Sequence, residues 1–269
     1  VYAAAYGENL GGVVDLTTLP GGEDWEFEIG SILPRVWWRD GKLQGIRRFN
    51  PRARLSGPVI PDRLRMSLAA EYRFDRERVW DTPGGRGDNI PTDGWDGVAQ
   101  FDWTPNTRHD VRFVFFSRPQ SVDFVGLGGL TPEETTSTHD TKVGSAAVDH
   151  QYRLDERSFI QTLVSWNRTG FNARSVQPVA SQPLFVIPDG FRGRAFHGED
   201  RRVGHWQLKS AYTRAIGTDA PRHVLQFGID IHDLRYRGES RNDPIEVRGV
   251  DGRLIQRTDF MNSGEVTAS

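Results

Sequence analysis

The sequence predicts an all-β fold of long antiparallel strands, and three observations lead to this prediction. Apolar and polar residues alternate with a period of two up to about residue 236, which is typical of strands with one apolar and one polar face. Helical periodicity is almost absent. The connectors between the expected strands alternate between short and long. Together these patterns indicate an up-and-down sheet whose two ends differ.

The expected strands follow one another from the beginning of the chain. A short, glycine-preceded strand is expected near residues 12–18. Nine longer strands follow, near 24–35, 52–59, 64–74, 95–104, 111–118, 142–153, 158–167, 202–214 and 223–236. In the third of these one face carries Leu64, Met66, Leu68, Ala70, Tyr72 and Phe74, and the other is mostly charged. The same division recurs in residues 95–103, 206–212 and 225–231, so one face of the sheet is expected to be apolar throughout.

The connectors distinguish the two ends of this sheet. Short, turn-forming segments follow the second, fourth, sixth and eighth long strands: IPDR, PNTRHD, LDER and AIGTDAPR. The other connectors are long, at 36–51, 75–94, 119–141 and 168–201, with a tail after residue 236. Outer-membrane barrels have short turns at one rim and long loops at the other. Many of the expected strands also reach 10 to 14 residues, close to the roughly 9–11 that cross a bilayer at a tilt. The sequence therefore predicts about nine strands of an antiparallel, up-and-down transmembrane β-barrel.

The two faces fit this prediction. The polar positions would face a wet lumen, and they include Glu26, Glu28, Arg52, Arg54, Arg65, Glu71, Arg73, Asp102, Arg112, Asp149, Lys209 and Asp230. Several large rings lie near expected strand ends, where interfacial aromatic belts occur: Trp25, Trp38, Trp95, Trp103, Trp166 and Tyr212. A single strand of this kind fits a half-exposed soluble sheet equally well. Nine in series with sorted connectors favour the barrel.

Composition excludes several other classes. The formal net charge is −2, with 34 basic and 36 acidic residues, so no overall field attracts nucleic acid. The absence of Cys excludes disulfides, a thiol nucleophile and Cys-ligated metal. No apolar run approaches the roughly 18–20 residues of a membrane-spanning helix. The first ten residues, VYAAAYGENL, lack the pattern of a signal peptide, so we expect a fragment of a longer protein.

The stretch YGENLGGVVDLTT, residues 6–18, resembles the end of the plug domain of TonB-dependent outer-membrane receptors. In that family a strand close to Gly-Gly-Val-Val-Asn-Ile-Thr-Thr ends the plug and leads into the barrel. The matching residues are Gly11, Gly12, Val13, Val14, Leu16, Thr17 and Thr18. Asp15 occupies the usual Asn position and is a mild departure. The glycines would allow a tight turn close to the barrel wall.

A second stretch, ARLSGPVIPDRLRMSLAAEYRFDRE at residues 53–77, resembles the second and third barrel strands of the same receptors. It is most similar to the Oar-like branch, whose members carry a carboxypeptidase-regulatory-like domain ahead of the plug. Ser56 replaces the first Gly of the pattern, and Met66 and Leu68 stand where aromatic residues are common. Beyond about residue 80 the resemblance is one of pattern only.

The resemblance implies two domains: the C-terminal end of a plug at residues 1–20 and the N-terminal part of a barrel at 21–269. It implies active uptake of a large extracellular substrate across the outer membrane of a Gram-negative-type bacterium. The implied partners are outer-membrane lipid, that substrate and a TonB complex, which would bind an N-terminal segment missing from this chain. Two alternatives remain open: a soluble secreted β-sheet protein that binds carbohydrate, and a passive or enzymatic outer-membrane barrel. The substrate is not identifiable from these residues.

The long connector 168–201 is the candidate ligand-contacting loop, because binding residues concentrate on loops held by a rigid scaffold. Its candidate residues are Arg174, Phe185, Phe191, Arg192, Arg194 and Phe196. Alternatively, the loop folds over the barrel mouth and packs its rings internally. No nucleophile elbow, metal-ligand spacing or phosphate-binding glycine loop occurs. His197, His205 and His232 are expected at solvated positions. No catalytic residue, metal or cofactor is therefore predicted.

Overall fold

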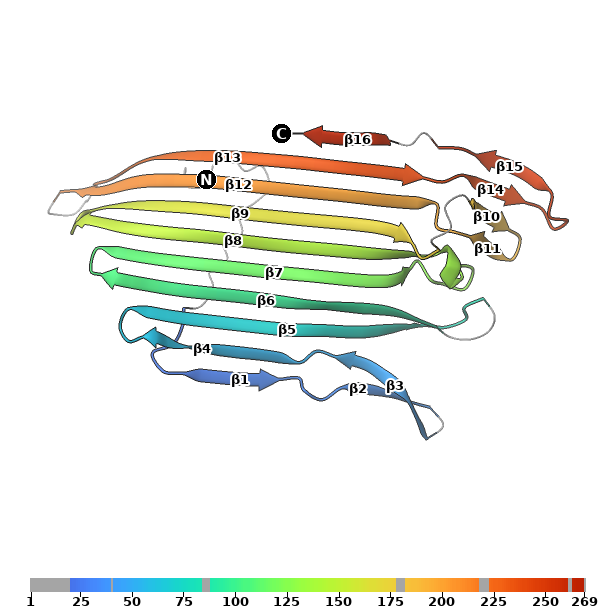
Figure 1. The fold of residues 1–269 in the computed structure, drawn as a ribbon, viewed down its shortest axis with the longest axis horizontal. Helices are drawn as coiled ribbons and strands as arrows, with labels where there is room; N and C mark the ends of the chain where they lie inside the picture. Colours follow the sequence, from blue (N-terminus) through green and yellow to red (C-terminus); the bar gives the residue numbers. More distant parts are fainter. Residues whose placement is uncertain are drawn as a thin grey trace.

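A computed structural model describes residues 20–39, 41–83, 88–177, 182–217, 223–260 and 263–268 of the chain. A broad antiparallel sheet of 12 strands dominates it, with a small second sheet of four strands at one end (Figure 1). Along its main path the large sheet has the order β1-β4-β5-β6-β7-β8-β9-β12-β13-β16. The strands therefore pair with their sequence neighbours, as in an up-and-down barrel wall.

The element bounds are as follows. The large sheet contains β1 (Glu26–Gly30), β2 (Arg35–Arg39), β3 (Lys42–Phe49), β4 (Arg52–Ile60), β5 (Leu64–Val79), β6 (Asp88–Asn106), β7 (His109–Val125), β8 (Ser137–Asp155), β9 (Ser158–Ser175), β12 (His197–Ile216), β13 (His223–Asn242) and β16 (Ser263–Ala268). The small sheet contains β10 (Leu184–Ile187), β11 (Gly190–Gly193), β14 (Ile245–Arg248) and β15 (Leu254–Thr258). A 3-10 turn, η2, covers Glu133–Thr135. Among the described residues no helix is long and apolar enough to cross a membrane.

The predicted fold class is confirmed, and each of the nine expected long strands has its counterpart in the large sheet. The strand expected near residues 12–18 lies outside the described residues. The predicted bounds were wrong at one end of the sheet. There β6 and β8 begin earlier, β9 ends later, and 36–51 contains a hairpin of β2 and β3 instead of an open loop. Backbone pairing continues in these segments although their side chains no longer alternate clearly.

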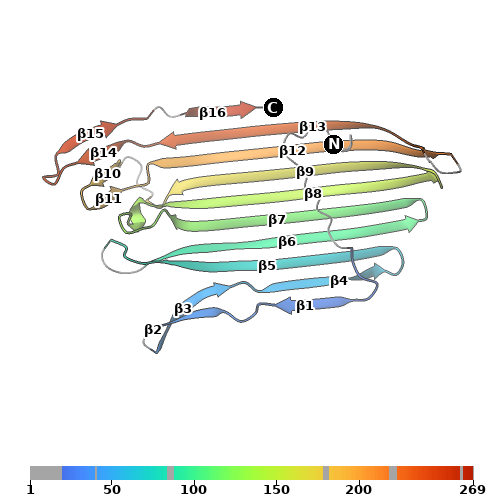
Figure 2. The ribbon, with the colours of Figure 1, turned by 180° about the vertical axis from the view of Figure 1, so that it is seen from behind.

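The two ends of the sheet differ as the connectors indicated. Residues 61–63, 107–108, 156–157 and 217–222 connect strands at one end, on the left of Figure 1, which we call the short-turn end. The small sheet and η2 lie at the opposite, long-connector end, and the view from behind shows the same arrangement (Figure 2). Strands of up to 20 residues run between the two ends.

The strand register sorts the side chains onto two faces. One row, which we use to define the apolar face, runs through paired residues of seven neighbouring strands: Met66, Phe101, Phe113, Val148, Val164, Leu208 and Ile231. The next row faces the other way and defines the polar face: Arg65, Asp102, Arg112, Asp149, Leu163, Lys209 and Asp230. Charges of opposite sign alternate along much of that row, which favours neighbouring pairs.

The apolar face has no protein cover among the described residues. Phe227 is 65% exposed, Ile229 58%, Trp206 52% and Phe115 47%. The buried apolar residues in the described part are only Leu127, Ala173 and Leu184. A continuous exposed apolar surface of this extent marks contact with another protein or with a membrane.

Candidate functional site

Aromatic residues border the apolar face at both ends. Toward the long-connector end the border is formed by Trp95, Trp166 and Trp206, and the rings of Trp166 and Trp206 lie 6.3 Å apart. Toward the short-turn end Trp103 pairs with Leu64. Trp95 and Trp103 are separated along β6 by a rise of about 26 Å at ~3.3 Å per residue. On a strand tilted by about 35–45° this rise corresponds to a height of about 20 Å, which fits within the ~25 Å apolar band of membrane barrels.

Beyond the Trp166–Trp206 border the same face becomes polar and charged. On β9 the residues that follow Trp166 on this face are Arg168, Gly170, Asn172 and Arg174, and on β12 Trp206 is followed by Gly204, Arg202 and Asp200. The strands and their pairing continue unchanged through this point. We call the part between the short-turn end and the aromatic border the membrane half of the sheet, and the rest the outer half.

The polar face carries ion pairs that bridge neighbouring strands. Arg112 contacts Asp102 at 2.9 Å, and Gln100 donates a hydrogen bond to the same carboxylate at 2.6 Å. Arg73 and Arg118 both contact Asp96, at 2.7 Å and 3.2 Å. The charged side chains of these pairs are about 20–44% exposed, so they remain in contact with water, whereas Gln100 is buried. A wet inner wall accommodates such charges without full desolvation.

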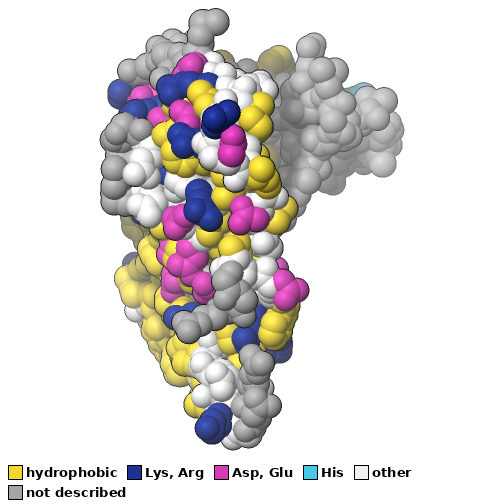
Figure 3. Space-filling model, turned by 90° about the vertical axis from the view of Figure 1, so that its right-hand side faces the viewer, with side chains coloured by type: hydrophobic (Ala, Val, Ile, Leu, Met, Phe, Trp, Pro, Cys, Tyr) yellow, Lys and Arg dark blue, Asp and Glu magenta, His cyan; other side chains and the backbone are white. Residues whose placement is uncertain are grey.

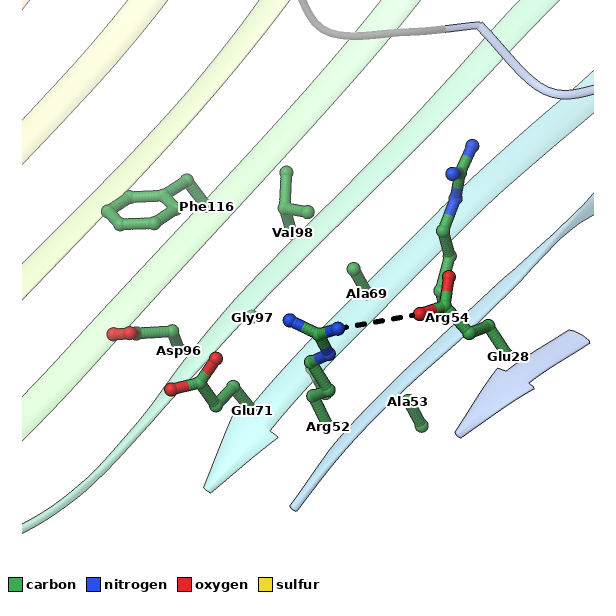
Figure 4. A pocket seen from close by; sticks show the side chains of 11 residues that line it. Glu28, Arg52, Ala53, Arg54, Ala69, Glu71, Asp96, Gly97, Val98 and Phe116 are labelled. Atoms are coloured by element: carbon green, nitrogen blue, oxygen red, sulfur yellow. Dashed lines mark ion pairs between the residues drawn. The ribbon is translucent and has the colours of Figure 1, made fainter. Parts of the chain in front are cut away.

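A hollow of about 400 Å³ opens on this face between β1, β4, β5 and β6 (Figure 4). Arg52 and Glu28 pair there at 3.6 Å, which is the dashed contact in the figure. Arg54 and Glu71 also line the hollow and make no ion pair with any described residue. Among the described residues, the hollow therefore presents one unpaired cation and one unpaired carboxylate, both available to a polar partner.

A chain of polar groups continues across β12 and β13 on the same face. The rings of His205 and His232 share a 3.0 Å nitrogen contact, His232 Nε2 lies 3.0 Å from Asp230, and Gln207 donates to Asp230 at 2.9 Å. His197 lies farther along the face, 3.9 Å from Glu199. These histidines are half-exposed or exposed, as expected from the sequence. In the described ranges no group of three or more His, Asp or Glu side chains could hold a metal ion.

The small sheet joins two connectors that lie far apart in the sequence. β10 and β11 form a hairpin, and β10 pairs in parallel with β14, which follows β13. Phe191 N–H donates to the carbonyl of Leu130 at 2.9 Å and so attaches a third connector, the one that contains η2. We call this three-connector unit the cap. Seen from that end, acidic and basic side chains alternate over its surface (Figure 3).

Buried carboxylates hold the cap together. Glu246 is only 7% exposed and contacts Arg248 at 2.7 Å and Arg257 at 3.0 Å. Asp243, 9% exposed, contacts Arg194 at 3.2 Å and Arg241 at 3.5 Å. A buried carboxylate with two guanidinium partners keeps its charge at low cost, because the paired charges and hydrogen bonds replace water.

Most of the predicted loop residues belong to this cap. Phe185 lies in β10, 4.6 Å beneath the guanidinium of Arg248, and Phe196 packs against Phe260 at 5.9 Å. Phe191 and Arg192 lie in β11, with Arg192 exposed. Phe185 and Phe196 thus make contacts within the cap, as in the internally packed alternative. Ligand contact by these residues stays a prediction.

Arg174 does not belong with the other loop candidates. It lies within β9, on the side of the apolar face, where it contacts Asp140 at 2.9 Å. The plug-like residues Gly11, Gly12, Val13, Val14 and Thr18 lie outside the described residues.

Sequence reasoning missed the cap residues that follow residue 236, because this segment read as a tail. Two signals were available. Asp-Gly turns at 189–190 and 251–252 stand between short apolar runs, which is a hairpin pattern. Gly190 and Gly252 have φ values of 142° and 76°, which glycine adopts without strain.

Glu133 and His139, which lie outside the membrane half, both have shifted pKa values. A hydrogen bond with Asp88, with burial and repulsion by the same carboxylate, raises the pKa of Glu133. Burial lowers the pKa of His139, and His197 lowers it further, while Glu199 opposes both. His139 also lies 5.3 Å from the ring of Phe171, edge to face. These shifts reflect crowding of the connectors at the outer end.

No protein-family model and no curated protein sequence matches this chain. Among solved structures the chain is similar to the outer membrane transporter YddB from Escherichia coli, with a TM-score of 0.58 and 12% identity. The match covers 83% of this chain and 31% of the transporter chain. The chain thus spans about a third of the length of the protein that it matches. At this identity the likeness shows the fold alone, a partial outer-membrane barrel.

Proposed function

We propose that this chain forms one wall of an outer-membrane β-barrel that transports a large substrate. The observation that supports this most strongly is the uncovered apolar row between two aromatic borders, backed by a row of alternating charges. A soluble sheet of this size would bury its apolar face in a core. A membrane barrel instead leaves that face to lipid and keeps the opposite face wet.

The wall belongs to a larger barrel. In the described sheet β1 and β16 lie at the two edges, and an open edge cannot be left unpaired within a bilayer, because its backbone groups would lack partners. Further strands would pair with these edges. The match covers 31% of the Escherichia coli transporter chain, which supports the proposal that this chain forms only part of a barrel wall.

The transport would be active and TonB-dependent. The support is the resemblance of residues 6–18 to the end of a plug and of residues 53–77 to the second and third barrel strands of TonB-dependent receptors. The hollow that contains Arg54 and Glu71 suits a polar plug held inside the barrel. The cap would lie outside the cell and contact the substrate, with Arg192 as one of its exposed cations. A TonB complex would bind the plug from the periplasm.

Cysteine labelling of the complete gene product in lipid vesicles tests the barrel. The chain has no Cys of its own, so single substitutions report one position each. We expect a water-soluble maleimide to label Lys209→Cys on the polar face and to leave its neighbour Leu208→Cys unlabelled. Asn172→Cys, on the same face as Leu208 but in the outer half, is a matched control and should be labelled. Equal labelling at 208 and 209 would contradict the barrel and favour a soluble sheet.

A second measurement tests the energy coupling. The complete gene product should bind the purified C-terminal domain of TonB, and deletion of its TonB-binding segment should abolish that binding. If the labelling supports a barrel but TonB does not bind, the protein is a passive barrel and only the coupling part of the proposal fails.

A further inference from the structure

A groove of about 570 Å³ lies on the outer half of the sheet, directly beyond Trp166. It runs over β8, β9 and β12 on the same side as the apolar face, so it faces away from the polar face. Its lining residues include five cations and the carboxylates Asp140 and Asp200. Lys142, Arg168, Arg174 and Arg202 lie on the side of the groove, whereas Arg201 belongs to the polar face. At this height, a groove on the outside of a membrane barrel lies at the level of the lipid headgroups.

Two of these cations have no acidic partner. Arg174 contacts Asp140 at 2.9 Å, and Arg202 contacts Asp200 at 3.1 Å. Lys142 and Arg168, by contrast, make no ion pair or hydrogen bond with any described side chain. The groove therefore carries two uncompensated positive charges, which favour an anionic ligand.

The floor of the groove is glycine where these two cations lie. Arg168 pairs across the strands with Gly144 and Gly204, and Lys142 pairs with Gly170. A Cβ atom at Gly170 or Gly204 would meet nothing within 4 Å. The space beside both cations is thus open.

A second, apolar groove of about 380 Å³ begins on the membrane side of the same Trp166. In one row across the strands, Ala146 lies between the larger rings of Phe115 and Trp166, and Ala99 lies on the other side of Phe115. The small side chains leave a trough between large rings, which suits an extended acyl chain. Trp166 lines both grooves, so a ligand with an anionic head and an apolar tail would contact them together.

We propose that the two grooves form one binding site for a phosphorylated lipid of the outer leaflet, such as lipid A. Lys142 and Arg168 bind a phosphate of the headgroup, and an acyl chain lies over Ala146, between Phe115 and Trp166. The site rests on the proposed membrane barrel, because only there do the grooves meet the leaflet. The continuity of the basic and apolar grooves favours a lipid over a free anion, which would use the basic groove alone.

The test measures lipid binding to the complete gene product in detergent by native mass spectrometry, with bisphosphorylated lipid A as the probe. We expect the double variant Lys142→Glu/Arg168→Glu to bind it about thirtyfold more weakly, which corresponds to about 2 kcal/mol. Arg76→Glu is the matched control, since Arg76 lies on the same face beyond Tyr72 but outside both grooves. Its affinity should match that of the unaltered protein.

A variant that keeps every charge tests the geometry. Gly170→Leu fills the open space beside Lys142 and should weaken lipid A binding at least about tenfold. Dephosphorylated lipid A should bind unaltered protein as weakly as bisphosphorylated lipid A binds the double variant. Three results would each contradict the proposed lipid site. They are equal affinity for the two lipids, the same loss of affinity in Arg76→Glu as in the double variant, and full displacement of lipid A by millimolar inorganic phosphate. If Leu208→Cys labelling supports the barrel and lipid A still fails to bind, only the lipid site is wrong.

Discussion

The two halves of β9 and β12 share one backbone and differ in the side chains on one face. Before Trp166 and Trp206 that face carries Val164 and Leu208, and beyond them it carries Arg168 and Arg202. The opposite face is polar in both halves. Strand pairing passes through the border without a shift. The border therefore reflects what surrounds the sheet, because the backbone pairing is satisfied equally on both sides of it.

The largest effect is expected from a charge on the apolar face of the membrane half. Leu208→Arg should destabilise the inserted protein by about 2–4 kcal/mol, since an arginine near the bilayer centre is poorly solvated. Urea unfolding in lipid vesicles, with heat-modifiable gel migration as a check of folding, measures this. Asn172→Arg, on the same face in the outer half, should change stability by less than about 0.5 kcal/mol. Similar costs at 172 and 208 would mean that the border does not separate two solvents.

The border also explains how far the fold could be predicted from the sequence. In the proposed barrel, lipid on one side of the membrane half and water on the other would force a period of two, and the alternation at residues 64–74 and 225–231 located strands correctly. Both faces of the outer half would meet water, and residues 168–175 lose the pattern although β9 continues through them. The outer part of β9 is held by its pairing with β8 and β12. Such pairing between distant segments leaves no signal in the local sequence.

A smaller effect is expected in the cap, where stability comes from buried charges instead of lipid. Glu246→Ala leaves Arg248 and Arg257 without their shared carboxylate, at a cost of about 1–2 kcal/mol, reduced because both guanidinium groups are partly exposed. Hydrogen exchange should accelerate in β10 and β14 and stay unchanged in the membrane half of β8. Arg253→Ala, whose pair with Asp251 is 88% and 56% exposed, should leave exchange unaltered. Faster exchange across the whole sheet would show that the cap is not a separate unit.

The cap also shows why the candidate site was predicted only in part. Connector 168–201 was singled out from its sequence, but its rings Phe185 and Phe196 contact Arg248 and Phe260, which come from a segment more than 50 residues later. A parallel pairing such as that of β10 with β14 joins distant segments and leaves no local signal beyond the two Asp-Gly turns.

On the polar face a single ion pair should matter little in either half. Arg73→Ala removes a 2.7 Å contact to Asp96, but Arg118 still contacts that carboxylate at 3.2 Å. With water present, we expect a loss of about 0–1 kcal/mol in urea unfolding. The double variant Arg73→Ala/Arg118→Ala should cost more than the sum of the two single changes, because each arginine substitutes for the other. A single-variant loss above about 2 kcal/mol would indicate a dry interior.

The smallest effect is expected from pH in the outer half. The pKa of His139 lies below its ordinary value of 6.5, chiefly through burial, then through His197, against the opposing pull of Glu199. The unfolded chain therefore binds more protons than the folded one between the two pKa values, so stability falls as pH drops below about 6.5. Protection factors, which correct hydrogen exchange for its intrinsic pH dependence, should be lower at the outer ends of β8 and β9 at pH 5.5 than at pH 7.5. His139→Gln should reduce that difference. If the variant keeps the full difference, the pH response arises elsewhere among the connectors. The next residue to test is then Glu133, whose pKa is raised beside Asp88.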